Sequence, residues 1–244
     1  MSKRQKMREK RRRQQRIQRM VAIGIIVLGA LLVTLVLILP NLGIFTGAIA
    51  TVESNPRPMA LENAMGDPNA PVKIYEYSDF QCPACARFWI ETEPKIVENY
   101  VKTGKVYFVS RSLGNMISEM INQQLGTDNT ESRDSAAAAY CAGDQGKYWG
   151  YHDILFANQT GEGVGDFSEE RLIAYAKELG LNMSDFKSCF NSGKYHERVA
   201  QDGVDGQAAG VHASPSFIIN GQLLVGAQPF EVFQQAIEAA LAGQ

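Results

Sequence analysis

The sequence VKIYEYSDFQCPAC occupies residues 72–85 and decides how the whole chain is interpreted. Its first six residues are mostly β-branched or aromatic, which predicts a buried strand. The residues after Cys85, ARFW, begin a helical pattern. Cys82 and Cys85 therefore lie three positions apart at a strand-to-helix junction, where the helix N-terminus stabilises a thiolate on the first cysteine. This pattern is typical of thiol–disulfide exchange, so we expect a redox-active pair.

The same two cysteines are also compatible with half of a zinc site. A structural zinc ion needs four ligands with regular spacing. The remaining candidate ligands show no second paired spacing: Cys141, Cys189, His152, His196 and His212. We therefore predict neither a metal site nor a bound cofactor.

Charge is distributed unevenly along the 244 residues. Residues 1–19 hold ten Lys or Arg and one acid, a local charge of +9, while the remainder holds 14 basic and 25 acidic side chains, a charge of −11. Residues 20–39 carry no charge and, as a helix, span about 30 Å, the thickness of a bilayer core. We expect residues 20–40 to form a transmembrane signal anchor that leaves the basic tail in the cytoplasm and the rest of the chain outside.

This N-terminal region has two alternative interpretations. A cleaved signal peptide has an apolar core of about 7–15 residues, shorter than this one, and the possible cleavage site at Ala50 lies eleven residues beyond Leu39. A basic arm can also bind nucleic acid, but beside an apolar span the topology explains the charges, so no nucleic-acid partner is expected. All four cysteines fall on the predicted outer side, where disulfides persist.

The pattern after the anchor predicts an α/β domain with a helical middle. Residues 41–62 have the Gly, Pro, Ser and Asn content of a linker, and residues 63–244 are expected to form one domain. The elements expected in it are strands at 72–78 and 105–110, a helix from Cys82 to Val101 bent at Pro94, a mostly helical insertion at about 112–209, a hairpin at 216–225 and a helix from Pro229.

Three separated blocks of sequence carry a family resemblance. They are Tyr77-Ser78-Asp79-Phe80-Gln81-Cys82-Pro83-Ala84-Cys85, Gln145-Gly146-Lys147-Tyr148-Trp149-Gly150-Tyr151-His152-Asp153 and Gly210-Val211-His212-Ala213-Ser214-Pro215-Ser216-Phe217-Ile218-Ile219-Asn220-Gly221. In this order they resemble the DsbA-like thiol–disulfide oxidoreductases, a branch of the thioredoxin superfamily. The resemblance runs from about Gly66 to the C-terminus and implies a thioredoxin fold with a helical insertion.

The resemblance also implies roles for individual residues. Cys82 is expected to be the attacking and attacked sulfur and Cys85 the resolving one. Ser214 and Pro215 match the loop that the family places opposite the active-site sulfur, with the proline cis; otherwise Pro215 simply starts an edge strand. Glu76 matches a buried acid that assists proton transfer at the resolving cysteine, unless it is an outward-facing strand residue.

The sequence differs from the family pattern at Ala84, and it contains two further cysteines that can form a second disulfide. Ala84 stands where the best-known oxidases of the family carry histidine, so we expect a less strongly oxidising pair. If Cys82 pairs with Cys85, then Cys141 and Cys189 are left for each other, and some family members have such a second bridge. The alternative is two buried free thiols.

We therefore expect a membrane-tethered enzyme that introduces disulfides into unfolded or partly folded extracytoplasmic proteins. The resemblance implies a membrane quinone-linked reoxidant. A reductase or isomerase with the same cysteines is the main alternative, although residues 41–65 are too short for a dimerisation region, so a monomer is expected. A tethered binding or chaperone module whose cysteines are structural is the alternative outside enzymes.

Overall fold

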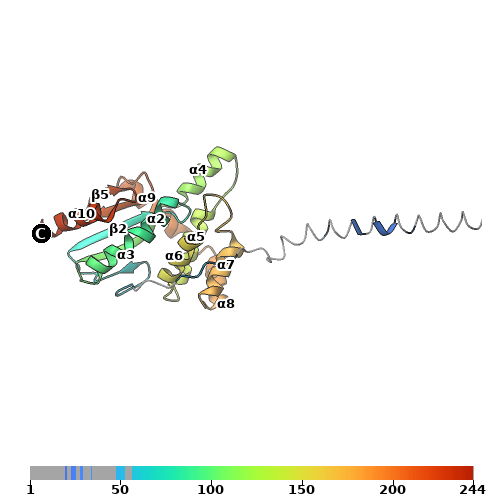
Figure 1. Ribbon diagram of the computed structural model, residues 1–244, viewed down its shortest axis with the longest axis horizontal. Helices are drawn as coiled ribbons and strands as arrows, with labels where there is room; N and C mark the ends of the chain where they lie inside the picture. Colours follow the sequence, from blue (N-terminus) through green and yellow to red (C-terminus); the bar gives the residue numbers. More distant parts are fainter. Residues whose placement is uncertain are drawn as a thin grey trace, which may run out of the picture. The chain divides into compact units, whose positions relative to one another are not determined.

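A computed structural model of the chain describes residues 48–52 and 57–243, together with scattered positions between 20 and 34 (Figure 1). The chain divides into two compact units, Met1–Gly47 and Ala48–Gln244. The predicted basic tail at 1–19 and most of the predicted anchor at 20–40 lie outside the described residues. Among the residues that are described, no helix is long and apolar enough to cross a bilayer. Within the described residues, all of the strands lie in the second unit.

A five-stranded mixed sheet forms the centre of this unit. Its strands are β1 (Ala64–Met65), β2 (Val72–Ser78), β3 (Val106–Ser112), β4 (Ser216–Ile219) and β5 (Gln222–Val225), in the spatial order β1-β3-β2-β4-β5. Only β2 and β3 run parallel; the other neighbours are antiparallel. The central strand β2 has its apolar residues Val72 and Ile74 fully buried, as its sequence predicted.

The helices beside the strands differ from expectation at one point. The predicted single helix from Cys82 to Val101 is three pieces, α2 (Pro83–Glu91), α3 (Glu93–Ile96) and a π-helical turn, η2 (Val97–Val101). Thr92 separates α2 from α3 with a φ of −116°, and Pro94 follows at the start of α3. Because Pro94 lacks a backbone N–H, it cannot donate to the carbonyl one turn earlier, so the break comes before the proline rather than as a bend at it.

The C-terminal helix α10 (Phe230–Ala242) covers the sheet beside α3. Phe88 of α2, Phe217 of β4 and Phe233 of α10 all pack against one another, with ring centroids 4.5, 5.4 and 4.7 Å apart. The three rings are buried. This aromatic cluster fixes the start of α2 against the sheet, which is where the cysteine pair lies.

The segment between β3 and β4 is a helical insertion, as expected. It contains α4 (Met116–Leu125), α5 (Glu131–Gly143), α6 (Tyr148–Ala157), α7 (Glu169–Glu178), α8 (Met183–Asn191) and α9 (His196–Ala208). Figure 1 shows α5 to α8 grouped at one end of the sheet. The consecutive alanines at 136–139 of α5 are buried, and their small side chains let α6, α8 and α9 approach α5 closely.

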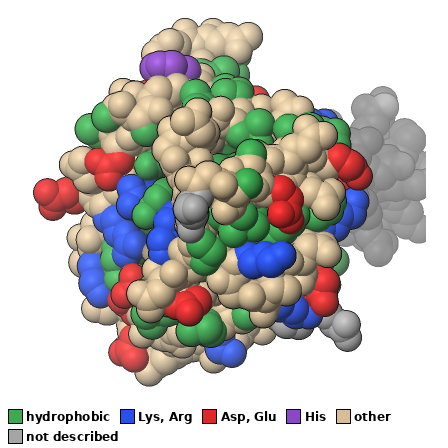
Figure 2. All heavy atoms as spheres, turned by 90° about the vertical axis from the view of Figure 1, so that its left-hand side faces the viewer, with side chains coloured by type: hydrophobic (Ala, Val, Ile, Leu, Met, Phe, Trp, Pro, Cys, Tyr) green, Lys and Arg blue, Asp and Glu red, His purple; other side chains and the backbone are tan. Residues whose placement is uncertain are grey.

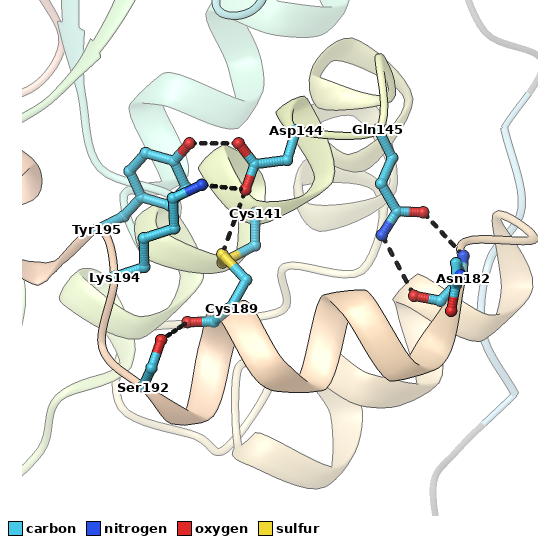
Figure 3. Close-up of a disulfide and its surroundings, with 8 residues drawn as sticks. All are labelled: Cys141, Asp144, Gln145, Asn182, Cys189, Ser192, Lys194 and Tyr195. Atoms are coloured by element: carbon cyan, nitrogen blue, oxygen red, sulfur yellow. Dashed lines mark hydrogen bonds and ion pairs between the residues drawn. A yellow bond between two sulfur atoms is a disulfide. The ribbon is translucent and has the colours of Figure 1, made fainter.

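The insertion is fastened by a disulfide between Cys141 of α5 and Cys189 of α8, whose Cα atoms are 5.8 Å apart (Figure 3). Close to it, Asp144 accepts hydrogen bonds from Lys194 Nζ at 2.7 Å and from the Tyr195 hydroxyl at 2.6 Å. The bridge and these polar contacts join the end of α5 to α8 and to the segment that leads into α9.

The surface that is visible in Figure 2 shows basic and acidic side chains interspersed among apolar ones. On the left of this view several basic side chains lie together, with acidic side chains above and below them.

Candidate active site at the start of helix α2

Cys82 is the N-cap residue of α2, and Pro83 is the first residue within the helix. Proline suits that position because the first helical N–H has no partner inside the helix. The carbonyl oxygen of Cys82 accepts hydrogen bonds from the backbone N–H groups of Cys85 at 3.0 Å and Ala86 at 3.2 Å. The backbone N–H of Cys82 donates to the Asp79 carbonyl at 2.9 Å. These bonds fix the backbone of Cys82 at the N-terminus of α2.

The two thiols of the pair face Ser214 in the loop before β4. Both cysteines are free and buried, with 6% of Cys82 and none of Cys85 exposed. The Cys82 thiol donates to the Ser214 carbonyl oxygen over 3.5 Å, and Cys85 Sγ lies 3.0 Å from the Ser214 hydroxyl. The Ser214–Pro215 peptide bond is cis. The structure thus brings Cys82, Cys85, Ser214 and Pro215 together.

The surroundings of the two thiols push their pKa values in opposite directions. The pKa of Cys82 falls from its ordinary value of 9.0 to about 6, first because Cys85 hydrogen-bonds to its thiolate and then because backbone N–H groups of α2 and Ser214 add to this, against the opposing effect of burial. Burial and the neighbouring Cys82 raise the pKa of Cys85 well above 9.0. Near neutral pH the reduced pair therefore carries its charge on Cys82.

Gln81 anchors the active-site turn to the helical insertion. Its side-chain amide donates to the hydroxyls of Ser118 on α4 at 2.9 Å and Ser132 on α5 at 2.8 Å, and its Oε1 accepts from the Gly163 backbone N–H at 2.8 Å. Its backbone carbonyl accepts from the Gln159 side chain at 2.7 Å. Gln81 is fully buried, so these bonds hold the residue before Cys82 in place from three directions.

Asp79 supports the same turn from inside. One carboxylate oxygen accepts from the Gln81 backbone N–H at 3.0 Å, and the other accepts from the Ile117 backbone N–H at 3.2 Å. Burial raises the pKa of Asp79 to about 6. The turn that carries Cys82 is therefore built on polar contacts that the sequence block contained but whose partners it did not reveal.

Glu76 lies in the interior, not on an outward-facing side of β2, because only 1% of it is exposed. The pKa of its carboxyl group is raised from 4.5 to about 7, first by burial and then by the nearby Glu93, against the opposing effects of His152, Ser78 and Ser110. Glu76 therefore belongs to a buried polar cluster that also contains Glu93 and His152. A role for Glu76 in proton transfer at Cys85 remains a prediction.

The sequence reasoning missed three side chains of that cluster: Arg57, Glu93 and His152. Arg57, assigned to the predicted linker, has its guanidinium Nη2 2.6 Å from Glu93 and 2.9 Å from Asp153. Its side chain is 3% exposed. A lone arginine before a domain carries no signal of burial, so only the fold reveals this contact.

Most of the chain matches a known protein family, and curated relatives share its sequence over about three quarters of its length. A family model described as Thioredoxin matches residues 60–239. The probable disulfide bond formation protein D of Bacillus cereus is 28% identical over 185 residues, which cover 74% of this chain and 79% of that protein. The Na⁺/H⁺ antiporter NhaA 1 of Salinispora arenicola is 31% identical over 183 residues, but the match spans only 25% of the antiporter's length.

Solved structures give the same picture of the fold. The crystal structure of oxidised BdbD from Bacillus subtilis has a TM-score of 0.63 at 20% identity and covers 79% of this chain and 100% of its own. That of α-DsbA1 from Wolbachia pipientis has a TM-score of 0.62 at 22% identity, covering 78% of this chain and 97% of its own. At these identities the likeness shows a shared fold: the mixed sheet with a helical insertion.

Proposed function

The chain belongs to the thioredoxin family and is a thiol–disulfide oxidoreductase of the DsbA-like type, and on this premise we propose that it donates disulfides to proteins outside the cytoplasm. The observation that carries the proposal is the position of Cys82 at the start of α2, where its pKa is lowered to about 6. A thiolate stabilised in the reduced state makes the corresponding disulfide a better oxidant. The name of the Bacillus cereus relative supports the same direction.

The exchange begins with the Cys82–Cys85 disulfide. A substrate thiolate attacks Cys82 Sγ, the bond to Cys85 breaks, and Cys85 leaves with the electron pair and takes up a proton because its pKa is high. A second substrate thiolate then attacks the substrate sulfur of the mixed disulfide and releases Cys82 as a thiolate. The substrate loses two electrons to form its disulfide, and the cysteine pair gains them.

Substrate chains are proposed to bind as extended segments along the loop before β4. Ser214 presents its backbone carbonyl oxygen toward Cys82, and the neighbouring His212 and Ala213 are exposed. Backbone groups in such a loop can pair with an unfolded peptide of almost any sequence, in the manner of strand addition. This suits an enzyme that acts on unfolded or partly folded proteins.

Repeated turnover needs an oxidant that removes two electrons from the reduced pair. We propose a membrane quinone-linked protein in this role, and we propose that residues 20–40 anchor the chain in the same membrane with the catalytic domain outside. The supporting observations are the uncharged stretch at 20–39 and the ten basic residues before it. Anchoring would keep the pair close to such a reoxidant.

The test is the equilibrium reduction potential of Cys82–Cys85 in the purified full-length chain, measured against glutathione. A value above about −200 mV, in the range of oxidising compartments, is the result expected of a disulfide donor. A value near about −270 mV, that of thioredoxin, would overturn the proposed direction and favour a reductase. Cys82→Ser, tested alongside, should abolish oxidation of a reduced unfolded substrate; retained activity would mean that the cysteines are structural.

A further inference from the structure

A second group of chemically active side chains lies inside the domain. Glu76 of β2, Glu93 of α3 and His152 of α6 bring potential metal-ligating atoms within 4.8 Å of one another. The three residues are 1%, 1% and 0% exposed. They come from three different elements, so the fold itself assembles the cluster.

Several polar atoms of this cluster lack hydrogen-bond partners. They include His152 Nε2, Glu76 Oε2 and both carboxylate oxygens of Glu93, although one of these also lies in the ion pair with Arg57. Buried polar atoms are nearly always paired, because leaving one unpaired costs about 1–3 kcal/mol. A group of unpaired lone pairs that converge from three residues is therefore a feature that a bound cation would explain.

The residues around the cluster orient the histidine as a ligand. His152 Nδ1 lies 3.1 Å from Asp153 Oδ1, which also accepts hydrogen bonds from Trp89 Nε1 at 2.9 Å and Arg57 Nη2 at 2.9 Å. With Nδ1 donating to this carboxylate, Nε2 keeps its lone pair free. A carboxylate behind the second ring nitrogen is the usual support of a metal-binding histidine.

The charges of the group also favour a divalent cation. Glu76, Glu93 and Asp153 contribute three negative charges when ionised, and Arg57 contributes one positive charge, which leaves a net charge of −2 in the interior. A divalent cation bound between these side chains would neutralise that excess charge.

We propose that Glu76, Glu93 and His152 form a binding site for a divalent transition-metal ion, with Zn²⁺ as the best match. One imidazole nitrogen and two carboxylate oxygens suit Zn²⁺, whereas Ca²⁺ takes six to eight oxygen ligands. At bond lengths of about 2.0–2.2 Å, tetrahedral ligand atoms lie roughly 3.4 Å apart, so the three ligand atoms, which lie within 4.8 Å of one another, must move closer together to bind the ion. A fourth position remains for water.

The first measurement is Zn²⁺ binding by the chelator-treated full-length chain in its oxidised form, in which Cys82 and Cys85 are bonded and cannot bind the ion. Equilibration must be long, because loading a buried site requires transient opening. We expect one Zn²⁺ per chain and a rise in the unfolding temperature. Glu93→Gln should weaken binding by more than the 10–100-fold typical of supporting residues. The matched control Glu91→Gln, at an exposed position of α2, should bind as the parent does.

A second readout identifies the ligands directly. Co²⁺ bound at this site should show visible bands typical of nitrogen and oxygen ligands without a thiolate charge-transfer band, and His152→Gln should remove those bands. Absence of saturable Zn²⁺ binding by the parent chain would overturn the proposal. Equal affinity in the parent, Glu93→Gln and His152→Gln would also overturn it, since the ion would then be bound elsewhere.

Discussion

Replacing Cys85 with alanine tests what stabilises the thiolate of Cys82. The lowering of the Cys82 pKa from 9.0 to about 6 corresponds to about 4 kcal/mol in favour of the thiolate, and the hydrogen bond from Cys85 is its largest cause. Hydrogen bonds to charged groups contribute about 1.5–3 kcal/mol, and a thiol is a weak donor, so the low end applies. Cys85→Ala should therefore raise the Cys82 pKa by about one unit, to about 7.

The assay is the ultraviolet absorbance of the thiolate as a function of pH. The sequence has four cysteines, and two of them, Cys141 and Cys189, are bonded, so each variant retains Cys82 as its single thiol. Cys85→Ser is the matched control, because its hydroxyl can still donate and should keep the pKa near 6. If Cys85→Ala titrates at the same pH as Cys85→Ser, the reasoning is refuted, and the backbone N–H groups of α2 stabilise the thiolate.

Three further results are expected. Gly206→Ala should lower the free energy of unfolding by about 1–3 kcal/mol in a denaturant titration, since the new Cβ would lie 2.9 Å from a Tyr77 ring carbon; an unchanged midpoint would contradict this. The double variant Cys141→Ser, Cys189→Ser should lose about 4 kcal/mol in the chain-entropy account, because the bridge closes a loop of 48 positions; a loss below about 1 kcal/mol would contradict it. The reduced chain should lose stability relative to the oxidised chain as pH falls from 9 through 6, because the pKa of Cys82 is lower in the folded state. At pH 7 about 1.4 kcal/mol of this contribution remains, which corresponds to about 30 mV in the glutathione equilibrium. The prediction is refuted if the difference in stability between the oxidised and reduced chains, corrected for the ordinary proton dependence of the couple, does not change with pH.

The sheet and the hairpin were predictable because their signals are local. The strand at 72–78, the Asn-Gly turn between β4 and β5 and the amphipathic helix α10 each follow from a few neighbouring residues, and the structure confirms them. The two-residue strand β1 was missed because two residues cannot show an alternating pattern. Its place in the sheet depends on pairing with β3, a contact between segments that the sequence does not show to be neighbours.

Helix α9 (His196–Ala208) lies within the expected helical insertion, but its own sequence gives only a weak helix signal. It contains Gly203 and Gly206, and glycine lowers helix propensity by about 1 kcal/mol relative to alanine. The structure gives both residues a packing role. A side chain at Gly206 would collide with Tyr77, and one at Gly203 would lie 3.2 Å from the Leu113 carbonyl oxygen. The local preference against helix is thus overridden by the close approach of α9 to the end of β3, which only the fold reveals.

The active site could be predicted from local sequence signals, whereas the buried cluster could not. Cys82 and Cys85 were identified because their spacing and helix position are local, and Ser214 because a family block marked it. Arg57 and Glu93 had neither signal: they are 36 residues apart and meet only in the folded chain. Their ion pair is fully buried, and an isolated charge at either position would be strongly unfavourable. The buried charge of Arg57 is balanced by Glu93 and by Asp153, which both lie far from it in the sequence, and no single position can display that dependence.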